Sequence, residues 1–506
     1  MYCKVWSGTL VGIKGLLIEV EVDVSEGFPK CDIVGTSSTT IKEAKERVRT
    51  GIRNIGLNFP FKRVTINLAP AHIPKDGVAF DLPMAIGILC CEKAFKETAI
   101  KDTLVLGEIA LNGDIRPVKG VLSLVDEACE LGLRRCIIPK ENVLEASLVT
   151  GMEVIGFSNL NEVLIFLKTG EIPIDEQESL SSYIPKRPKN EWPIDFSQVV
   201  GQKKAKRGLE IAVCGMHHAM LIGPPGIGKT MLAKRVKTIL PEMTKEEVLE
   251  LTKIYSAAEK LISSNAVIEE RPFRDPHHSI TRASFIGGSS KGKPGEICLA
   301  HHGILMLDEF PEFKRDVIES LREPLEQGAI LLSRNQNVFS FPAKFILVAA
   351  MNPCPCGYFP NQNKCKCLPS EIDKYQGKIS GPILSRIDLF IEMNPNSYEK
   401  MVLSKEEETS ADILLRVTKA HKIQKERYEK LNIDYNSQLN VDQIKVYCKL
   451  DPVAQEMMKQ AYTSLNLSSR SYHRLLKVAR TIADIEESEQ ILSKHLAEAI
   501  MFRREA

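Results

Sequence analysis

The sequence predicts an α/β protein in three parts, in which two α/β blocks precede a helical block. Strand-like and helix-like runs alternate through residues 1–169 and again through 193–395, and helical periods dominate residues 396–506. Apolar runs rich in β-branched residues favour strands, whereas apolar residues spaced by three and four favour helices. The middle block carries a glycine-rich loop, two strands that end in acidic or amide side chains, and a cysteine cluster.

Length and composition are those of a globular protein with several domains. Of its 506 residues, 43% are hydrophobic and 26% are charged, and the net charge is only +2. A charge this close to zero indicates no particular partner, so any contact with nucleic acid has to be local. The chain has no apolar run of about eighteen residues and no secretory leader pattern. We therefore expect a cytoplasmic protein with no membrane partner.

The first two segments of the chain differ in their apolar patterns. Within residues 1–169 we expect strands at LLIEVEVDV, RVTINLA and TLVLGEIAL, and helices at IKEAKERVRTGIRNIG, FDLPMAIGILCCEKA and LSLVDEACELG. Residues 170–192, GEIPIDEQESLSSYIPKRPKNEW, carry proline, serine and charge without an apolar period. Such a composition buries little surface, so we expect a linker there.

The segment AMLIGPPGIGKTMLAKRV is typical of a phosphate-binding loop between a strand and a helix. Glycines let backbone N–H groups surround phosphate oxygens at the start of the helix. Lys229 would place its charge on the β- and γ-phosphates of ATP, and the Thr230 hydroxyl would bind Mg²⁺. The predicted nucleotide-binding loop consists of Gly223, Pro224, Pro225, Gly226, Ile227, Gly228, Lys229 and Thr230.

Two further strands are expected to end at the same site. The run GILMLDE ends in Asp308 and Glu309, and FILVAAMN ends in Asn352. Ligands of α/β sheets lie at the carboxyl ends of the strands. Asp308 would hold Mg²⁺, Glu309 would polarise the attacking water, and Asn352 would orient it. The alternatives are strand-end solvation for the acids and a simple turn residue for Asn352.

Together these segments resemble the AAA+ family of the magnesium-chelatase type, and within it the YifB/ComM group. The residues that carry the resemblance are GPPGIGKT, LMLDE, AAMNPCPCG, GPILSRIDL, RPFRDPHHSIT, IGGSSKGKPGEICLAHHGILMLDEFPEF and LREPLEQG. The resemblance covers essentially the whole chain. It implies a homohexameric ATPase whose C-terminal block, residues 396–506, is a helical lid.

The resemblance also assigns two arginines. Arg386 in GPILSRIDL matches an arginine finger that reaches the γ-phosphate of the neighbouring subunit, which explains why such motors form rings. The alternative is a structural ion pair between Arg386 and Asp388. Arg470 in LNLSSRSYHR matches a second arginine that acts in cis from the helical block, with Arg474 as the competing residue. Ser468 or Ser469 would cap that helix.

Two inserts are candidate contacts for DNA. ILLSRNQNVFSFPAKF has the pattern of a hairpin, and in similar AAA+ proteins a hairpin here points into the ring channel. Arg334 near its tip would track a phosphate backbone. Lys291 and Lys293 lie in the glycine-rich segment IGGSSKGKPGE, whose position resembles a second channel insert; a solvated loop is the alternative for each lysine.

Four of the 13 cysteines are clustered in CPCGYFPNQNKCKC. Two C-x-C pairs joined by a loop can converge on one tetrahedral ion, and Zn²⁺ with four thiolates is the expected occupant. Free or redox-active thiols are the alternative, and Lys364 and Lys366 would contact DNA beside the cluster. The predicted zinc ligands are Cys354, Cys356, Cys365 and Cys367.

Two histidine pairs, His277 with His278 and His301 with His302, invite a metal interpretation. Adjacent side chains on a strand point in opposite directions, so the two rings of a pair would not share an ion. We therefore expect packing or hydrogen-bonding roles for these residues.

The first block resembles the proteolytic domain of Lon proteases, an S5-type α/β fold. The resemblance lies in GEIALNGDIRPVKGVLSLVDEA, IIPKEN and PKDGVAFDLP. Lon proteolysis uses a serine nucleophile and a lysine base, whose places here are taken by Ala79 and Leu122. Neither side chain can attack a carbonyl or accept a proton, so we expect no peptidase activity.

Three functions remain open. The preferred one, implied by the resemblance, is a hexameric ATPase that translocates on DNA and remodels branched or recombining DNA. The alternatives are a chelatase-type motor that drives metal insertion through partner proteins, and an ATP-dependent scaffold that remodels proteins. The Lon-like block and the cysteine segment match YifB/ComM proteins rather than dedicated chelatase subunits, so we expect no tetrapyrrole. The complete set of predicted catalytic residues disfavours a scaffold that only holds ATP.

Overall fold

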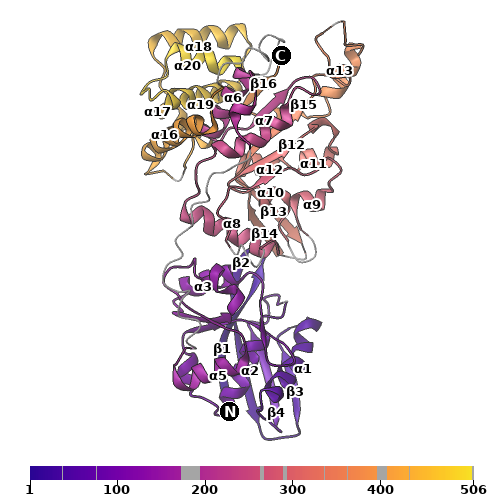
Figure 1. The fold of residues 1–506 in the computed structure, drawn as a ribbon, viewed down its shortest axis with the longest axis vertical. Helices are drawn as coiled ribbons and strands as arrows, with labels where there is room; N and C mark the ends of the chain where they lie inside the picture. Colours follow the sequence, from indigo (N-terminus) through magenta and orange to yellow (C-terminus); the bar gives the residue numbers. More distant parts are fainter. Residues whose placement is uncertain are drawn as a thin grey trace.

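The computed structural model of the protein describes residues 1–36, 38–75, 77–172, 194–261, 267–288, 293–334, 337–361, 363–395, 407–431 and 433–503, without the side chains of residues 333, 334, 337 and 338. The chain is elongated (Figure 1), with an N-terminal domain at one end, a core domain in the middle and a helical domain beside the far end of the core. The predicted α/β class with a helical C-terminal part is confirmed.

The N-terminal domain is built on a seven-stranded mixed sheet with the order β3-β4-β2-β1-β5-β8-β9. Its strands are β1 (Tyr2–Val11), β2 (Lys14–Ser25), β3 (Lys30–Val34), β4 (Arg63–Ala69), β5 (Thr103–Val105), β8 (Arg135–Pro139) and β9 (Glu153–Phe157), beside a small ribbon of β6 (Glu108–Ile109) and β7 (Ile115–Arg116). Its helices are α1 (Thr39–Asn54), α2 (Asp81–Cys91), α3 (Val121–Glu130), α4 (Val143–Ala146) and α5 (Leu160–Thr169). The apolar α2 is buried along its whole length, as its sequence predicts.

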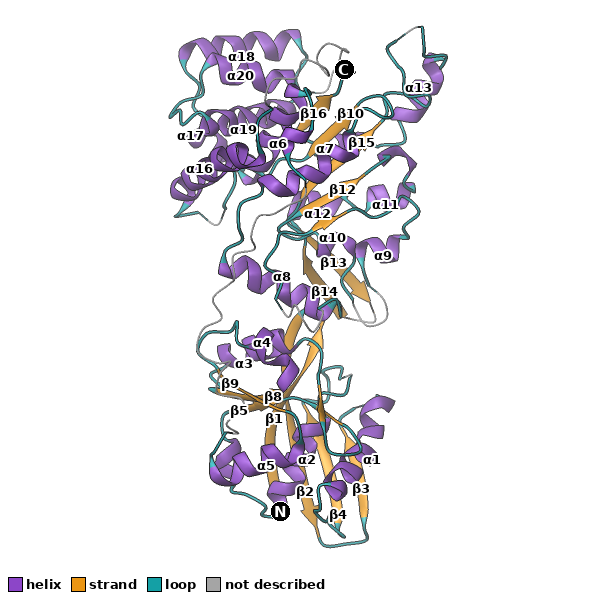
Figure 2. Ribbon diagram, viewed as in Figure 1, coloured by secondary structure: helices purple, strands orange, loops and turns teal. Residues whose placement is uncertain are grey.

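The core domain is built on a five-stranded sheet with the order β11-β12-β15-β10-β16, and every adjacent pair is parallel. The strands are β10 (Ala219–Ile222), β11 (Phe273–Arg274), β12 (Ile304–Leu307), β15 (Ile346–Met351) and β16 (Leu389–Glu392). Strands β12 and β15 are buried at every position, as expected of parallel strands covered on both faces. Figure 2 shows this sheet running obliquely through the upper half of the molecule, among its helices.

The remaining elements of the core surround this sheet. The helices are α6 (Lys203–Gly215), α7 (Lys229–Arg235), α8 (Lys245–Ala257), α9 (Arg282–Ile286), α10 (Glu296–Leu299), α11 (Arg315–Glu319), α12 (Arg322–Gln327), α13 (Pro369–Gln376) and α14 (Gly381–Leu384). The predicted hairpin is confirmed as β13 (Ala329–Arg334) paired antiparallel with β14 (Asn337–Pro342).

The helical domain consists of α16 (Ser410–Tyr428), α17 (Val441–Tyr447), α18 (Pro452–Ser464), α19 (Ser469–Ile485) and α20 (Ser493–Met501). Ser468 is the N-cap of α19 and accepts a hydrogen bond from the backbone N–H of Ser471, which confirms one of the two predicted caps. Helices α16 and α19 both pack against α6 of the core. A shared apolar cluster therefore joins the helical domain to the sheet.

The predicted linker, residues 170–192, falls largely on residues 173–193, which lie outside the described residues. The boundary between the second and third blocks lies beside residues 396–406, which are also outside them. The domain limits given above therefore stay predictions. In the part of the chain that the structure describes, no helix is long and apolar enough to cross a membrane.

Helix α8 makes polar contacts between the N-terminal domain and the core. Ser256 accepts a hydrogen bond from the N–H of Gly120 at 3.1 Å and donates one to the Glu145 carboxylate at 2.9 Å. Nearby, Lys253 forms an ion pair with Asp126. Because Ser256 and Glu145 are both buried, the hydroxyl satisfies polar groups that water does not reach.

We predict that Ser256→Ala lowers the thermal stability of the protein. The change leaves the N–H of Gly120 and the carboxylate of Glu145 without this partner, and an unsatisfied buried group costs about 1–3 kcal/mol. Calorimetry should show a lower midpoint for the first unfolding transition. Ser464→Ala is the matched control, because that exposed hydroxyl bonds only to the carbonyl of Gln460 in its own helix. Equal midpoints for the two variants would contradict the prediction.

Candidate nucleotide-binding site and cysteine cluster

Three strand ends form the candidate site. In the sheet β15 lies between β12 and β10, so their carboxyl ends lie side by side. The loop after β10 leads to Lys229 and Thr230, β12 is followed by Asp308, and β15 is followed by Asn352. Residues from three distant parts of the chain thus meet at the edge where α/β proteins bind ligands.

Lys229 is at the centre of this edge. Its ammonium group donates to the carbonyl oxygens of Gly223 and Pro224, at 2.7 and 3.0 Å, and to Oδ1 of Asn352 at 2.9 Å. Burial lowers the pKa of Lys229, and the charges of Asp308 and Glu309 act in the opposite direction. The ammonium group is therefore positioned among oxygen atoms that a phosphate group could replace.

The acidic residues Asp308 and Glu309 have different environments. The Thr230 hydroxyl donates to a carboxylate oxygen of Asp308, which places together the two side chains predicted to hold Mg²⁺. Glu309 has a φ of +50° in the left-handed region, and its side chain is 60% exposed. Nδ1 of His278 lies 3.5 Å from Oε2 of Glu309. Glu309 is thus free to face solvent beside the site.

Arg386 does not pair with Asp388, so the alternative of a structural ion pair between them is wrong. Its guanidinium forms an ion pair with Glu326 and donates to the carbonyl of Pro382 at 2.8 Å. Asp388 instead contacts His217 at 3.1 Å. Burial acts to raise the pKa of Asp388, but the His217 hydrogen bond and nearby positive charges outweigh it and hold that pKa below its usual range.

The two candidate arginines of α19 lie near Arg386. Arg474 donates to the carbonyl oxygens of Ser385 and Ile387, which flank Arg386, at 2.8 and 2.6 Å. Arg470 is exposed, and its charge acts on Glu326, the partner of Arg386. Arg474 is therefore committed to backbone contacts, whereas Arg470 is available to a ligand.

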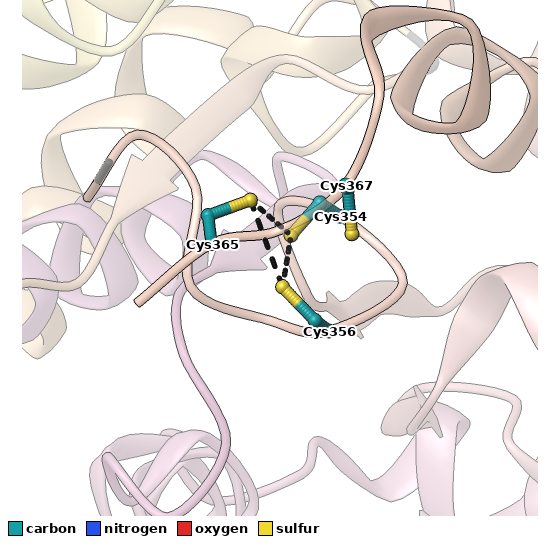
Figure 3. Close-up of side chains that lie close together, drawn as sticks. All are labelled: Cys354, Cys356, Cys365 and Cys367. Atoms are coloured by element: carbon teal, nitrogen blue, oxygen red, sulfur yellow. Dashed lines mark hydrogen bonds between the residues drawn. The ribbon is translucent and has the colours of Figure 1, made fainter. Parts of the chain in front are cut away.

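The four clustered cysteines converge (Figure 3), with all four sulfur atoms within 4.8 Å of one another. The sulfur of Cys354 lies 3.4 Å from that of Cys356 and 3.8 Å from that of Cys365, and the last two are 3.6 Å apart. These distances are far longer than a disulfide of about 2.05 Å. Thiolates bound to one zinc ion at about 2.3 Å lie about 3.8 Å apart, so the arrangement fits a tetrahedral site.

Backbone N–H groups donate to the sulfur atoms of Cys354 and Cys356. The N–H of Phe359 donates to the sulfur of Cys354 at 3.4 Å. A backbone hydrogen bond from Tyr358 is the main reason that the pKa of Cys356 is lowered to about 6. Metal ligands commonly receive such outer hydrogen bonds, and thiolate is the form that binds metal. The residues present therefore fit Zn²⁺.

The histidine pairs do have hydrogen-bonding roles, but the expectation that their rings diverge is wrong. The ring centroids of His301 and His302 lie 3.8 Å apart, and those of His277 and His278 lie 4.1 Å apart. The reason is that neither pair is on a strand, and His302 has a φ of +56°. Adjacent side chains in a turn can lie on the same side.

The cluster of Glu250, His301 and His302 is arranged for hydrogen bonding rather than for metal binding. The N–H of Lys344 donates to Nδ1 of His301 at 3.0 Å, so the proton of the neutral ring is on Nε2. That nitrogen faces the carboxylate of Glu250 at 3.1 Å. Burial lowers the pKa of His301 to about 4, which keeps the ring neutral. A metal on Nε2 would require the proton on Nδ1, where the backbone donor already is.

The candidate DNA contacts are only partly described. Lys291 and the side chain of Arg334 lie outside the described residues. Lys293 forms an ion pair with Glu259 at 2.8 Å, and Glu259 also contacts Lys119 of the N-terminal domain at 2.9 Å. This bridge ties the base of the glycine-rich insert to the N-terminal domain.

In the N-terminal domain, Leu122 is fully buried among apolar side chains. Ser123, which follows it, is also buried, and its hydroxyl has no hydrogen-bond partner among the described residues. Lys119 is mostly exposed and contacts Glu259. The expected lack of peptidase activity stays a prediction.

The residues that the sequence did not assign to the nucleotide site or the cysteine cluster are Glu326, His278, Gly357 and Gln376. Each contacts a predicted site residue or the cysteine segment from a distant position or from a turn. Glu326 lies in LREPLEQG and His278 in RPFRDPHHSIT, so the segments that carry the family resemblance could have indicated these two.

Comparisons with known proteins agree with this geometry. The family profile described as "Magnesium chelatase, subunit ChlI" matches residues 195–401, "Subunit ChlI of Mg-chelatase" matches 20–142, and "Magnesium chelatase, subunit ChlI C-terminal" matches 407–503. Among relatives, "Lon protease 2" of Bacillus subtilis is 32% identical over 170 residues, covering 30% of this chain and 30% of that protein.

Two relatives match over nearly their whole length. "Competence protein ComM" of Haemophilus influenzae is 40% identical over 501 residues, covering 99% of this chain and 97% of that protein. "Uncharacterized protein YifB" of Escherichia coli is 40% identical over 499 residues, covering 97% of this chain and 95% of that protein. The chain therefore belongs to the ComM/YifB family of magnesium chelatase-like AAA+ ATPases.

Proposed function

We propose that this protein is a ring-forming motor that hydrolyses ATP to move along DNA and to remodel branched or recombining DNA. The observation that carries the proposal is the meeting of Lys229, Thr230, Asp308 and Asn352 at one edge of the parallel sheet. Such an edge, with a phosphate loop and two polar strand ends, is suited to binding ATP and cleaving its terminal phosphate.

The side chains at this edge have complementary tasks. Phosphate oxygens of ATP take the place of the carbonyl oxygens that Lys229 now contacts. Thr230 and Asp308 are the residues that would hold Mg²⁺, whose charge offsets that of the phosphates. Glu309 accepts a hydrogen bond from the attacking water and Asn352 orients it. The exposure of Glu309 allows it to reach this water.

Arg386 completes the site of a neighbouring subunit. In the single chain its guanidinium is occupied by Glu326, so in a ring the γ-phosphate would replace this carboxylate. The charge of Arg470 acts on the same carboxylate, and Arg470 would serve the nucleotide of its own subunit in cis. Because Arg386 has to come from a neighbour, hydrolysis requires a homohexameric ring.

The name of one relative supports DNA as the substrate. The Haemophilus relative is named for competence, a process in which cells take up DNA. The hairpin of β13 and β14 belongs to the core, as does the glycine-rich insert between α9 and α10. Lys291, Lys293 and Arg334 would contact the DNA backbone in the ring channel, where positive charge is required.

The four-cysteine site holds Zn²⁺ in a structural role. Four thiolates leave no open position on a tetrahedral ion, so the metal takes no part in hydrolysis. Cys354, Cys356, Cys365 and Cys367 would be the ligands, and Lys364 and Lys366 project from the same loop. The N-terminal domain serves assembly or binding rather than proteolysis.

We predict that Glu309→Gln keeps ATP binding but lowers ATP turnover about 10²-fold or more, since the variant loses its general base. ATPase assays with and without forked DNA should show stimulation of the wild type and none of the variant. Glu312→Gln is the control, because Glu312 is an exposed acid three residues further on that pairs with Lys378. Turnover of the wild type that no form of DNA changes would favour a chelatase-type or protein-remodelling motor.

We also predict one zinc ion per chain in protein purified without chelators. Cys365→Ser should lose most of this zinc, because three thiolates bind the ion less tightly than four. Cys129→Ser serves as the control, since Cys129 is also half-buried but lies outside the cluster. Elemental analysis of the three proteins gives the answer, and a metal-free wild type that is fully folded would refute the assignment.

A further inference from the structure

The cysteine segment is anchored at the nucleotide site. Strand β15 ends at Met351, Asn352 follows, and the first metal-binding cysteine comes only two residues later. At the other end of the segment, the side chain of Gln376 donates to the carbonyl of Pro353 at 3.0 Å. The two ends of the cysteine segment, at Pro353 and Gln376, are therefore in contact. Asn352, the residue just before the segment, accepts a hydrogen bond from Lys229.

Gly357 brings the cysteine segment against the phosphate loop. It is buried and has a φ of +84°, and its N–H donates to the carbonyl of Cys354 at 3.0 Å. A Cβ atom placed on Gly357 would lie 2.4 Å from Cδ of Pro225 and 3.7 Å from Cγ of Asn352. No side chain fits there, so the turn after Cys356 packs directly between a loop residue and Asn352.

We propose that the four-cysteine centre positions the ATP site of its own subunit, acting through Gly357 on Pro225 and through Pro353 on Asn352. A metal ion held by Cys354, Cys356 and the second cysteine pair fixes the turn that carries Gly357. With Gly357 held in place, the phosphate loop that contains Pro225 has less freedom to move. The inference rests on the proposed function, because it requires that Lys229 and its loop bind ATP.

If the two sites are coupled, metal binding and ATP binding must affect each other. If the bound metal favours the conformation of the loop that binds ATP, then ATP must favour metal binding by the same factor. A metal that only stabilises a distant surface loop would show no such effect. Nucleotide binding and metal binding can therefore each report on the other.

The contact itself is tested with Gly357→Ala, which introduces the methyl group that meets Pro225. We expect the variant to keep its metal but to bind a fluorescent ATP analogue about tenfold more weakly. Gly132→Ala is the matched control, because Gly132 has a similar φ of +91° with no atom near its would-be Cβ. Gly132→Ala should bind the analogue as the wild type does.

Pro225→Ala removes the Cδ atom that the new methyl group would meet. In a double-mutant cycle, Gly357→Ala should therefore weaken ATP binding less in the Pro225→Ala background than in the wild type. Equal losses in the two backgrounds would overturn the contact as the route of coupling, even if Gly357→Ala alone is impaired or poorly folded.

The effect of ATP on the metal site is tested with the full-length Glu309→Gln protein loaded with Co²⁺. The absorption bands of cobalt bound to thiolates report on the geometry of the site. We expect ATP to shift these bands, and Gly357→Ala to abolish or reduce the shift. Bands unchanged by ATP in a protein that binds the analogue would refute the coupling alone. A wild type that does not bind the analogue at all would overturn the proposed function, and the coupling with it.

Discussion

The parallel pairing of β12, β15 and β10 is the constraint on which the rest of the structure depends. Each strand is short, but the pairing places the residues that follow them, Asp308, Asn352 and the loop that leads to Lys229, at one edge. The hydrogen bond between Lys229 and Asn352 spans 123 positions of sequence, and no local preference could produce it. Burial of β12 and β15 on both faces stabilises this arrangement, because a shift in register would displace every polar group of the site.

The domains on either side are tied to this sheet by different kinds of contact. The helical domain shares an apolar cluster with the core. The hydrophobic effect that holds the two together does not depend on the direction of individual contacts. The N-terminal domain is attached through hydrogen bonds and ion pairs around α8, together with Ile13, which packs against the core cluster near the hairpin. Such polar contacts depend on geometry, so they constrain the orientation of the N-terminal domain relative to the inserts of the core.

Much of the fold was predictable because its patterns are local. The strand AMLI, the cap Ser468 and the hairpin before Phe345 each depend on residues close in sequence, and the structure has them. Local sequence patterns could not predict the partner of Arg386, because Glu326 lies 60 positions away on α12. The histidine rings were misjudged because a positive φ at His302 is a property of the turn. Convergence of the cysteines was predictable from their spacing, but their contact with the phosphate loop was not.

The central claim is that ATP is hydrolysed between two subunits, one supplying Lys229 and the other Arg386. Mixing the variants Lys229→Ala and Arg386→Ala tests it most directly, because a mixed ring contains interfaces in which both wild-type residues meet. The account predicts that each variant alone is inactive and that the mixture regains a substantial fraction of wild-type ATP turnover. Full turnover by Arg386→Ala alone, or a mixture of correctly assembled subunits that stays as inactive as its components, would contradict it.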